Sequence, residues 1–143
     1  MAVVTTISNH AKYMLATKEI DFDNDVFKVI LMDDTFTFDK DADATLSDVT
    51  ADQLSTANGY TQDDKTLTGI SVTEDDSNDK AAITWDNPTW TASGGSIGAT
   101  GALIVYDDTT ADDTVIFCSD FGTDYTITDG TSFQPQNLAV DLS

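Results

Sequence analysis

The segment "SGGSIG", residues 93–98, fits the pattern G-x-S-x-G and places Ser96 at its centre. In α/β hydrolases this pattern presents a nucleophilic serine on a sharp turn between a strand and a helix. Here the pattern is followed by "GATGALIVYDD", in which two glycines precede a β-branched apolar run, so a loop that enters a strand is expected. The only histidine, His10, lies far upstream, whereas those hydrolases place the histidine after the serine. We therefore predict that Ser96 and His10 have no catalytic role and that the chain is not an enzyme.

Alternating carboxylates are the second candidate for chemistry, because calcium-binding loops begin in this way. Aspartates alternate in "DKDAD" (residues 39–43), but Ala44 and Thr50 stand where an EF-hand requires Gly and Glu. The similar "DFDND" (residues 21–25) is followed by Val26 where Gly is required. Solvated turns are the favoured interpretation of these clusters, with an adventitious calcium site as the alternative. We predict no metal and no other cofactor.

The remaining chemistry-bearing residues give weaker signals. One His and one Cys cannot supply a zinc ligand set, and Cys118 lies in the apolar run "TVIFCSDF", where it is expected to fill the core. Trp85 and Trp90 flank "DNP" and are candidates for a platform that stacks on sugars. At least Trp85 continues the alternation of Ala81 and Ile83, which favours packing inside the protein. A carbohydrate-binding module is kept as a minor alternative.

The charge balance excludes several classes of partner. The chain has 143 residues, with 26 acidic residues, 6 Lys and no Arg, and a net charge of -20. Nucleic acids are bound through basic residues that neutralise phosphates, so neither nucleic acid nor an anionic membrane is an expected partner. All acidic residues except Glu19 and Glu74 are Asp, which favours turns over helix interiors. The first residues lack the features of a secretory signal, so folding in a cytoplasm is expected.

One helix is expected near the N-terminus. In "SNHAKYMLATKEI", Ser8 or Asn9 can cap a helix in which Ala11, Met14 and Leu15 share one stripe. The segment from about residue 1 to 20 is expected to form an N-terminal arm and helix, and the core is expected not to need the arm, Ala2–Ser8.

Short strands are expected over the rest of the chain. In "VFKVILMD" the residues Phe27, Val29 and Leu31 alternate with Ile30 and Met32, which predicts a strand buried on one face and partly covered on the other. Six further strands are expected in "KTLTGISVT", "KAAITW", "GALIVYDD", "TVIFCSDF", "TDYTITDG" and "NLAVDL", separated by Asp-, Gly- and Thr-rich turns. The sequence therefore predicts one mainly β domain over residues 1–143, a β-sandwich or Greek-key barrel of about seven to nine strands.

The order of several motifs resembles a family of small virion structural proteins from tailed bacteriophages. The resemblance begins with "HAKYMLATKEIDFDNDVFKVILMDDTFTF", in which an A-K-Y-x-L segment leads through "IDF" to a strand of the type F-K-V-x-L. It continues through "SDV", "GYT", "KTLTG", "ITW", "GALIVYDDT" and "DFG", and so covers nearly the whole chain. The loop "SGGSIGAT" departs from the pattern as a longer entry into its strand.

The resemblance implies a role in virion assembly, with no catalytic residues. The leading expectation is a capsid decoration (cement) protein that binds the outside of the head and bridges subunits of the major capsid protein, as a homotrimer or homodimer. A tail, neck or baseplate component is the alternative. The N-terminal stretch from Ala2 to Lys18 has no acidic residue and carries two of the six lysines, so Lys12, Tyr13, Met14 and Lys18 are the predicted partner-binding residues.

Overall fold

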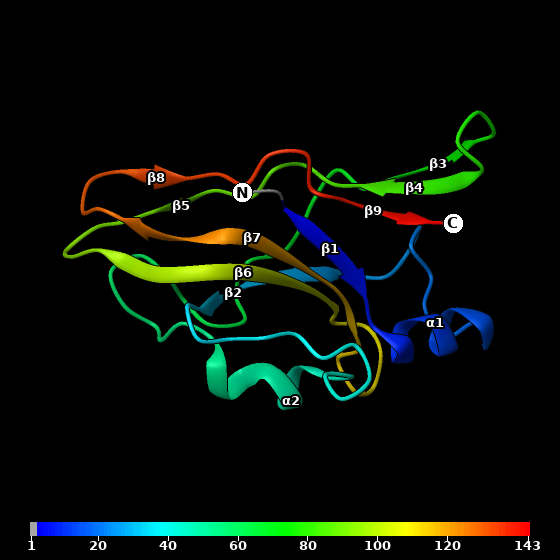
Figure 1. Cartoon of the computed structure of the whole chain (residues 1–143), viewed down its shortest axis with the longest axis horizontal. Helices are drawn as coiled ribbons and strands as arrows, with labels where there is room; N and C mark the ends of the chain where they lie inside the picture. The colour runs from blue at the N-terminus through cyan, green and yellow to red at the C-terminus, as the bar shows by residue number, and fades with distance from the viewer. Residues whose placement is uncertain (1–2) are drawn as a thin grey trace.

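The computed structural model describes residues 3–143 and is mainly β, with 42% of residues in strands and 11% in helices. The main sheet has the order β1 (Val4–Ile7), β7 (Val115–Ile127), β6 (Ile97–Asp107) and β2 (Phe27–Asp33). The second sheet has the order β3 (Ser71–Asp75), β4 (Lys80–Thr84) and β9 (Ala139–Leu142), and β5 (Trp90–Thr91) pairs with β8 (Ser132–Phe133). All pairings are antiparallel, and the predicted β-sandwich-like class is confirmed (Figure 1).

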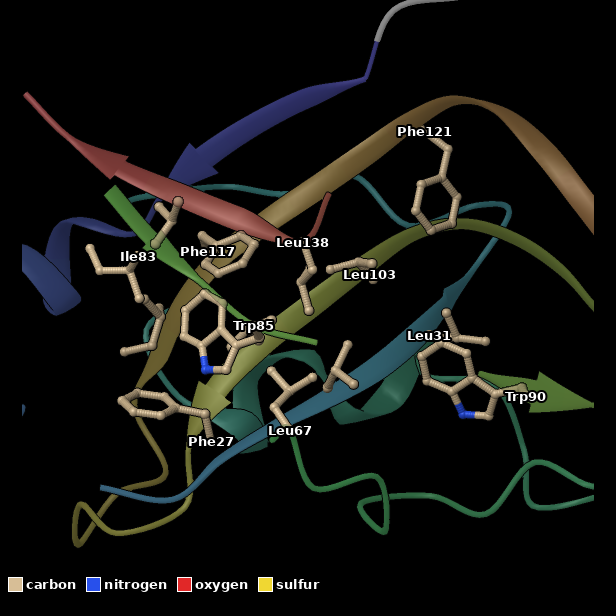
Figure 2. Close-up of a cluster of buried hydrophobic side chains, with 14 of the residues drawn as sticks. Phe27, Leu31, Leu67, Ile83, Trp85, Trp90, Leu103, Phe117, Phe121 and Leu138 are labelled. Atoms are coloured by element: carbon tan, nitrogen blue, oxygen red, sulfur yellow. The ribbon is translucent and has the colours of Figure 1, made fainter. Parts of the chain in front are cut away.

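The principal core lies between the two larger sheets. From β2 it receives Phe27, Val29 and Leu31, the inward set predicted from the alternation. Figure 2 shows the aromatic centre of this core, where Trp85 packs edge-on against Phe27, with ring centroids 5.7 Å apart. Alternate residues of a strand point to opposite faces, so period-two hydrophobicity identifies the buried face correctly.

A second core covers the outer face of the main sheet. Ile30 and Met32 of β2 are buried there, together with side chains of β6 and β7. Phe36, Phe38 and Val49, from the segment that follows β2, close this layer. That segment contains the short helix α2 (Leu46–Val49) and the 3-10 turn η1 (Thr50–Asp52). On this face Ile30 and Met32 are buried, whereas Lys28 is half-buried and Val26 is 45% exposed, so the expected partial cover of the second face is confirmed.

The predicted N-terminal helix is α1 (Asn9–Ala16). Ser8 is its N-cap: the Ser8 hydroxyl accepts a hydrogen bond from Ala11 N at 2.9 Å and donates one to Val115 O at 2.6 Å. Ser8 and Ala11 are fully buried, so the start of the helix is fixed to the sheet.

The expectation of an N-terminal arm that the core does not need is wrong for residues 4–8. Val4–Ile7 forms the edge strand β1, paired with β7 from Val4 opposite Asp120 to Ile7 opposite Phe117. Ile7 also packs against the principal core. Residues 1 and 2 of the predicted arm lie outside the described residues.

Strand boundaries differ from the prediction in several places. The strand β3 begins at Ser71 and not at Lys65, and β6 begins at Ile97 and not at Gly101. The predicted strands in "TVIFCSDF" and "TDYTITDG" are one long strand, β7, and the very short β5 and β8 have no counterpart in the prediction. Among residues 3–143 no helix is long and apolar enough to cross a membrane.

Candidate docking surface

Ser96 and His10 lie on different elements and bond to different partners. Ser96 is exposed in the loop before β6, and its hydroxyl accepts a hydrogen bond from Asp129 N at 3.3 Å. His10, on α1, is 2.8 Å from a carboxylate oxygen of Asp112. A strand, β6, follows Ser96 as predicted, although it begins at Ile97 and includes residues 97–100, which were expected to be loop; the strand-to-helix turn of a nucleophile elbow is not formed at this position.

The two alternating aspartate segments form closely similar turns. In residues 21–25 the Asp25 carboxylate accepts from Asp21 N, and the Asp21 carboxylate accepts from Asp23 N. Residues 39–43 repeat both bonds at the equivalent positions. Each turn uses its carboxylates to satisfy its own backbone, as Asx turns do. In the part of the chain that the structure describes, no group of three or more His, Cys, Asp or Glu side chains is arranged to hold a metal ion.

Both tryptophans and the cysteine are core residues. Trp85 is 6% exposed and Trp90 is 3% exposed, so neither offers a face on which a sugar could stack. Burial raises the pKa of the Cys118 thiol to about 12, which leaves it protonated and unreactive. The carbohydrate-binding alternative thereby loses the residues that motivated it.

The lysines divide into two groups. Lys28 and Lys80 form ion pairs with Asp108 and Asp141, and Lys65 lies over the ring of Trp90. Lys12, Lys18 and Lys40 make no ion pair with any of the described carboxylates.

These three lysines gather around α1 and form what we call the lysine end (Lys12, Lys18 and Lys40). Lys12 is on α1, and Lys18 follows its C-terminus with a positive φ of 65°. Lys40 belongs to a distant loop, but its carbonyl oxygen accepts a hydrogen bond from Asn9 N at 2.9 Å, which holds the loop against the start of the helix.

Of the four residues predicted to bind a partner, three are exposed in the structure. Lys12 and Lys18 are exposed, and the Tyr13 side chain is 62% exposed and stacks on His10. Met14 is half-buried and packs against the principal core. The sequence did not identify Lys40, because its proximity to α1 depends on the path of the chain between them.

A groove opens beside the lysine end, between the free edges of β1 and β9. It has a volume of about 510 Å³, and we call it the edge groove. It is lined by residues 5–7 of β1, residues 139–143, Lys12 and Lys40. The two strands belong to different sheets, and neither is paired with the other (Figure 1).

The opening continues into an apolar groove of about 350 Å³ that shares Thr5 and Ala139 with the edge groove. Its lining includes Phe121, Tyr125 and Phe133, whose rings pack against one another. One side of the sandwich therefore offers a basic rim, two free strand edges and an aromatic surface in succession.

Comparisons with known proteins give no relative for this chain. No family model, no curated protein and no solved structure matches it.

Proposed function

We propose that this protein is a structural component of a tailed-bacteriophage virion, a capsid decoration protein that binds the outside of the head. In this proposal the lysine end and the edge groove contact subunits of the major capsid protein, and the acidic loops face solvent. The motif order described above motivates the family. The single structural observation that supports the proposal is the group of three lysines around α1 that form no ion pair with a described carboxylate.

Charge distribution favours this orientation. A net charge of -20 repels packaged DNA, so an exterior position is less costly than an interior one. The lysine end provides local attraction to acidic groups on a partner, and exposed Tyr13 provides an aromatic contact of the kind that is common at the centre of interfaces. A head displays many copies of the same site, so a homotrimer or homodimer would bind with high avidity even if each contact were weak.

The direct test is to label the protein fluorescently and to locate it on particles from a phage that lacks its gene. Label over the head shell is expected. Label confined to the tail would overturn the decoration role and favour the alternative, a tail, neck or baseplate component.

A charge variant tests the surface itself. Replacing Lys12, Lys18 and Lys40 together with Gln should weaken attachment about tenfold, since exposed ion pairs contribute roughly 0.5 kcal/mol each. The matched control replaces Lys28, Lys65 and Lys80 with Gln, which changes the net charge equally but lies elsewhere. Equal loss of attachment in both variants would show that overall charge, and not the lysine end, controls binding.

A further inference from the structure

The register of β1 fixes which of its backbone groups are free. Ser8 N donates to Ile116 O at 2.9 Å, and the same register pairs Thr6 with Cys118. In an antiparallel pair, hydrogen-bonded and non-hydrogen-bonded residues alternate. Thr6 therefore bonds to β7, and the N–H and C=O groups of Thr5 and Ile7 point away from β7, into the edge groove.

The same reasoning applies to β9. Trp85 N donates to Leu138 O at 3.1 Å, and the register then pairs Ile83 with Val140. Val140 therefore bonds to β4, and the N–H and C=O groups of Ala139 and Asp141 point away from β4. No backbone hydrogen bond to these outward groups is found among residues 3–143.

The edges of β1 and β9, on which alternate backbone groups have no hydrogen-bond partner, thus face one groove. In Figure 1 the blue arrow of β1 and the red arrow of β9 run in roughly the same direction, and in Figure 2 they are inclined to each other but still point to the same side. A strand that ran antiparallel to both would join the two sheets into one continuous order: β3, β4, β9, the added strand, β1, β7, β6 and β2. Four residues suffice to match the lengths of β1 and β9, a span of about 13 Å at the usual rise per residue.

We infer that the edge groove is an acceptor site for one extended strand supplied by the partner protein. The inference rests on the proposed docking surface and specifies how it binds. Strand addition to an exposed sheet edge is a recurring mode of recognition, in which main-chain bonds give affinity and side-chain contacts give specificity.

The groove also defines the chemistry of the added strand. Ile7 and Leu142 line it and pack against the principal core, so inward-facing side chains of the strand are apolar. Lys12 and Lys40 line the groove without any carboxylate partner, so an acidic side chain of the strand lies at that end.

A second copy of this chain is a poor occupant. The added strand must have both of its edges free, because it bonds to β1 on one side and to β9 on the other. Each of the nine strands in the described part of the chain is already paired on at least one edge. The occupant is therefore a lone extended segment of a different protein.

Proline variants test the site, because proline lacks the N–H group but is tolerated on the free edge of a strand. Thr5→Pro and Ala139→Pro should each weaken attachment to particles from the gene-deleted phage about tenfold, the effect of one lost hydrogen bond. Thr5→Val and Ala139→Val are the matched controls, because they keep the N–H group, and they should bind within about twofold of wild type. Equal binding by proline and valine variants would overturn the strand-addition model.

Hydrogen exchange provides a second measurement that does not depend on the variants. The amides of Thr5, Ile7, Ala139 and Asp141, which have no backbone partner in the free protein, should exchange rapidly there and become protected on the particle. Attachment without this protection would overturn strand addition while leaving the decoration role intact, and no attachment of the wild-type protein would overturn the decoration role itself. Protection produced by excess free protein alone would identify a second copy as the occupant and would also overturn the inference.

Discussion

Asp107, at the end of β6, should make the stability of this protein depend on pH. Its side chain is fully buried: Oδ1 accepts a hydrogen bond from Thr109 N at 2.8 Å, and Oδ2 has no hydrogen-bond donor among the described residues. Burial, and after it the adjacent carboxyl group of Asp25, raises the pKa of Asp107 from 3.8 to about 7. Two carboxylates in contact cannot both ionise without cost, so one proton is retained in the folded state.

The sign of the effect follows from proton counting. Between about pH 4 and pH 7 the folded protein holds a proton on Asp107 that the unfolded chain has released, so the free energy of unfolding falls as pH rises through this window. A shift of about three pKa units sets an upper bound on the order of 4 kcal/mol. We expect a loss of about 1–3 kcal/mol, because the effective dielectric constant around buried groups in proteins is higher than that of a dry interior.

Asp107→Asn tests this reasoning. The amide keeps the shape of the side chain and donates a hydrogen bond to Asp25 at every pH, so the variant should be more stable than wild type by about 1–3 kcal/mol at pH 8 and similar to it near pH 4. Urea unfolding at several pH values, followed by the fluorescence of buried Trp85 and Trp90, measures the difference. Asp76→Asn, at an exposed turn position, removes the same charge and should stay within about 0.5 kcal/mol of wild type. If Asp107→Asn and wild type lose stability equally between pH 5 and 8, Asp107 does not retain a proton in the folded protein.

Two further variants test the packing. Val29→Asp should prevent stable folding, because it places an unpaired charge in the principal core at a cost of more than about 4 kcal/mol. Val72→Asp, at an exposed position of β3, is the matched control. Similar melting temperatures for the two variants would show that the inward face of β2 is misassigned. Ser8→Ala should cost about 1–3 kcal/mol in urea unfolding, because it removes both bonds of the buried N-cap, and a change below about 0.5 kcal/mol would mean that neighbouring groups replace them.

The sequence was sufficient where periodicity and local capping decide the structure. The alternation around Val29 and Ile30 identified a strand and separated the residues of its two cores, because side chains of a strand alternate between faces whatever the rest of the chain does. The sequence narrowed the helix cap to Ser8 or Asn9, and the structure shows that it is Ser8, whose bond to Ala11 N spans only three residues. The run after Ser96 was correctly predicted as a strand for the same local reason.

Local signals failed where a short segment depends on a distant partner. Val4–Ile7 is too short to show a clear period, and it is a strand because β7 lies beside it. The side chains that cover Met32 likewise come from a loop, through Phe36 and Phe38. Nothing in the neighbouring sequence indicates that this loop folds back onto the sheet. Contacts between such distant segments require the closure of a long loop, which costs entropy. Whether they form therefore depends on the stability of the whole fold and not on the local sequence.

Some features of the docking surface could likewise be predicted from the sequence, and others depend on the tertiary structure. The sequence by itself determined the charge of -20 and the low acidity of the segment that carries Lys12 and Lys18. Only the tertiary structure brought Lys40 to α1 and left the edges of β1 and β9 facing one groove. Which backbone groups point into that groove is fixed by strand register, and a shift of one residue would exchange the free groups for the bonded ones.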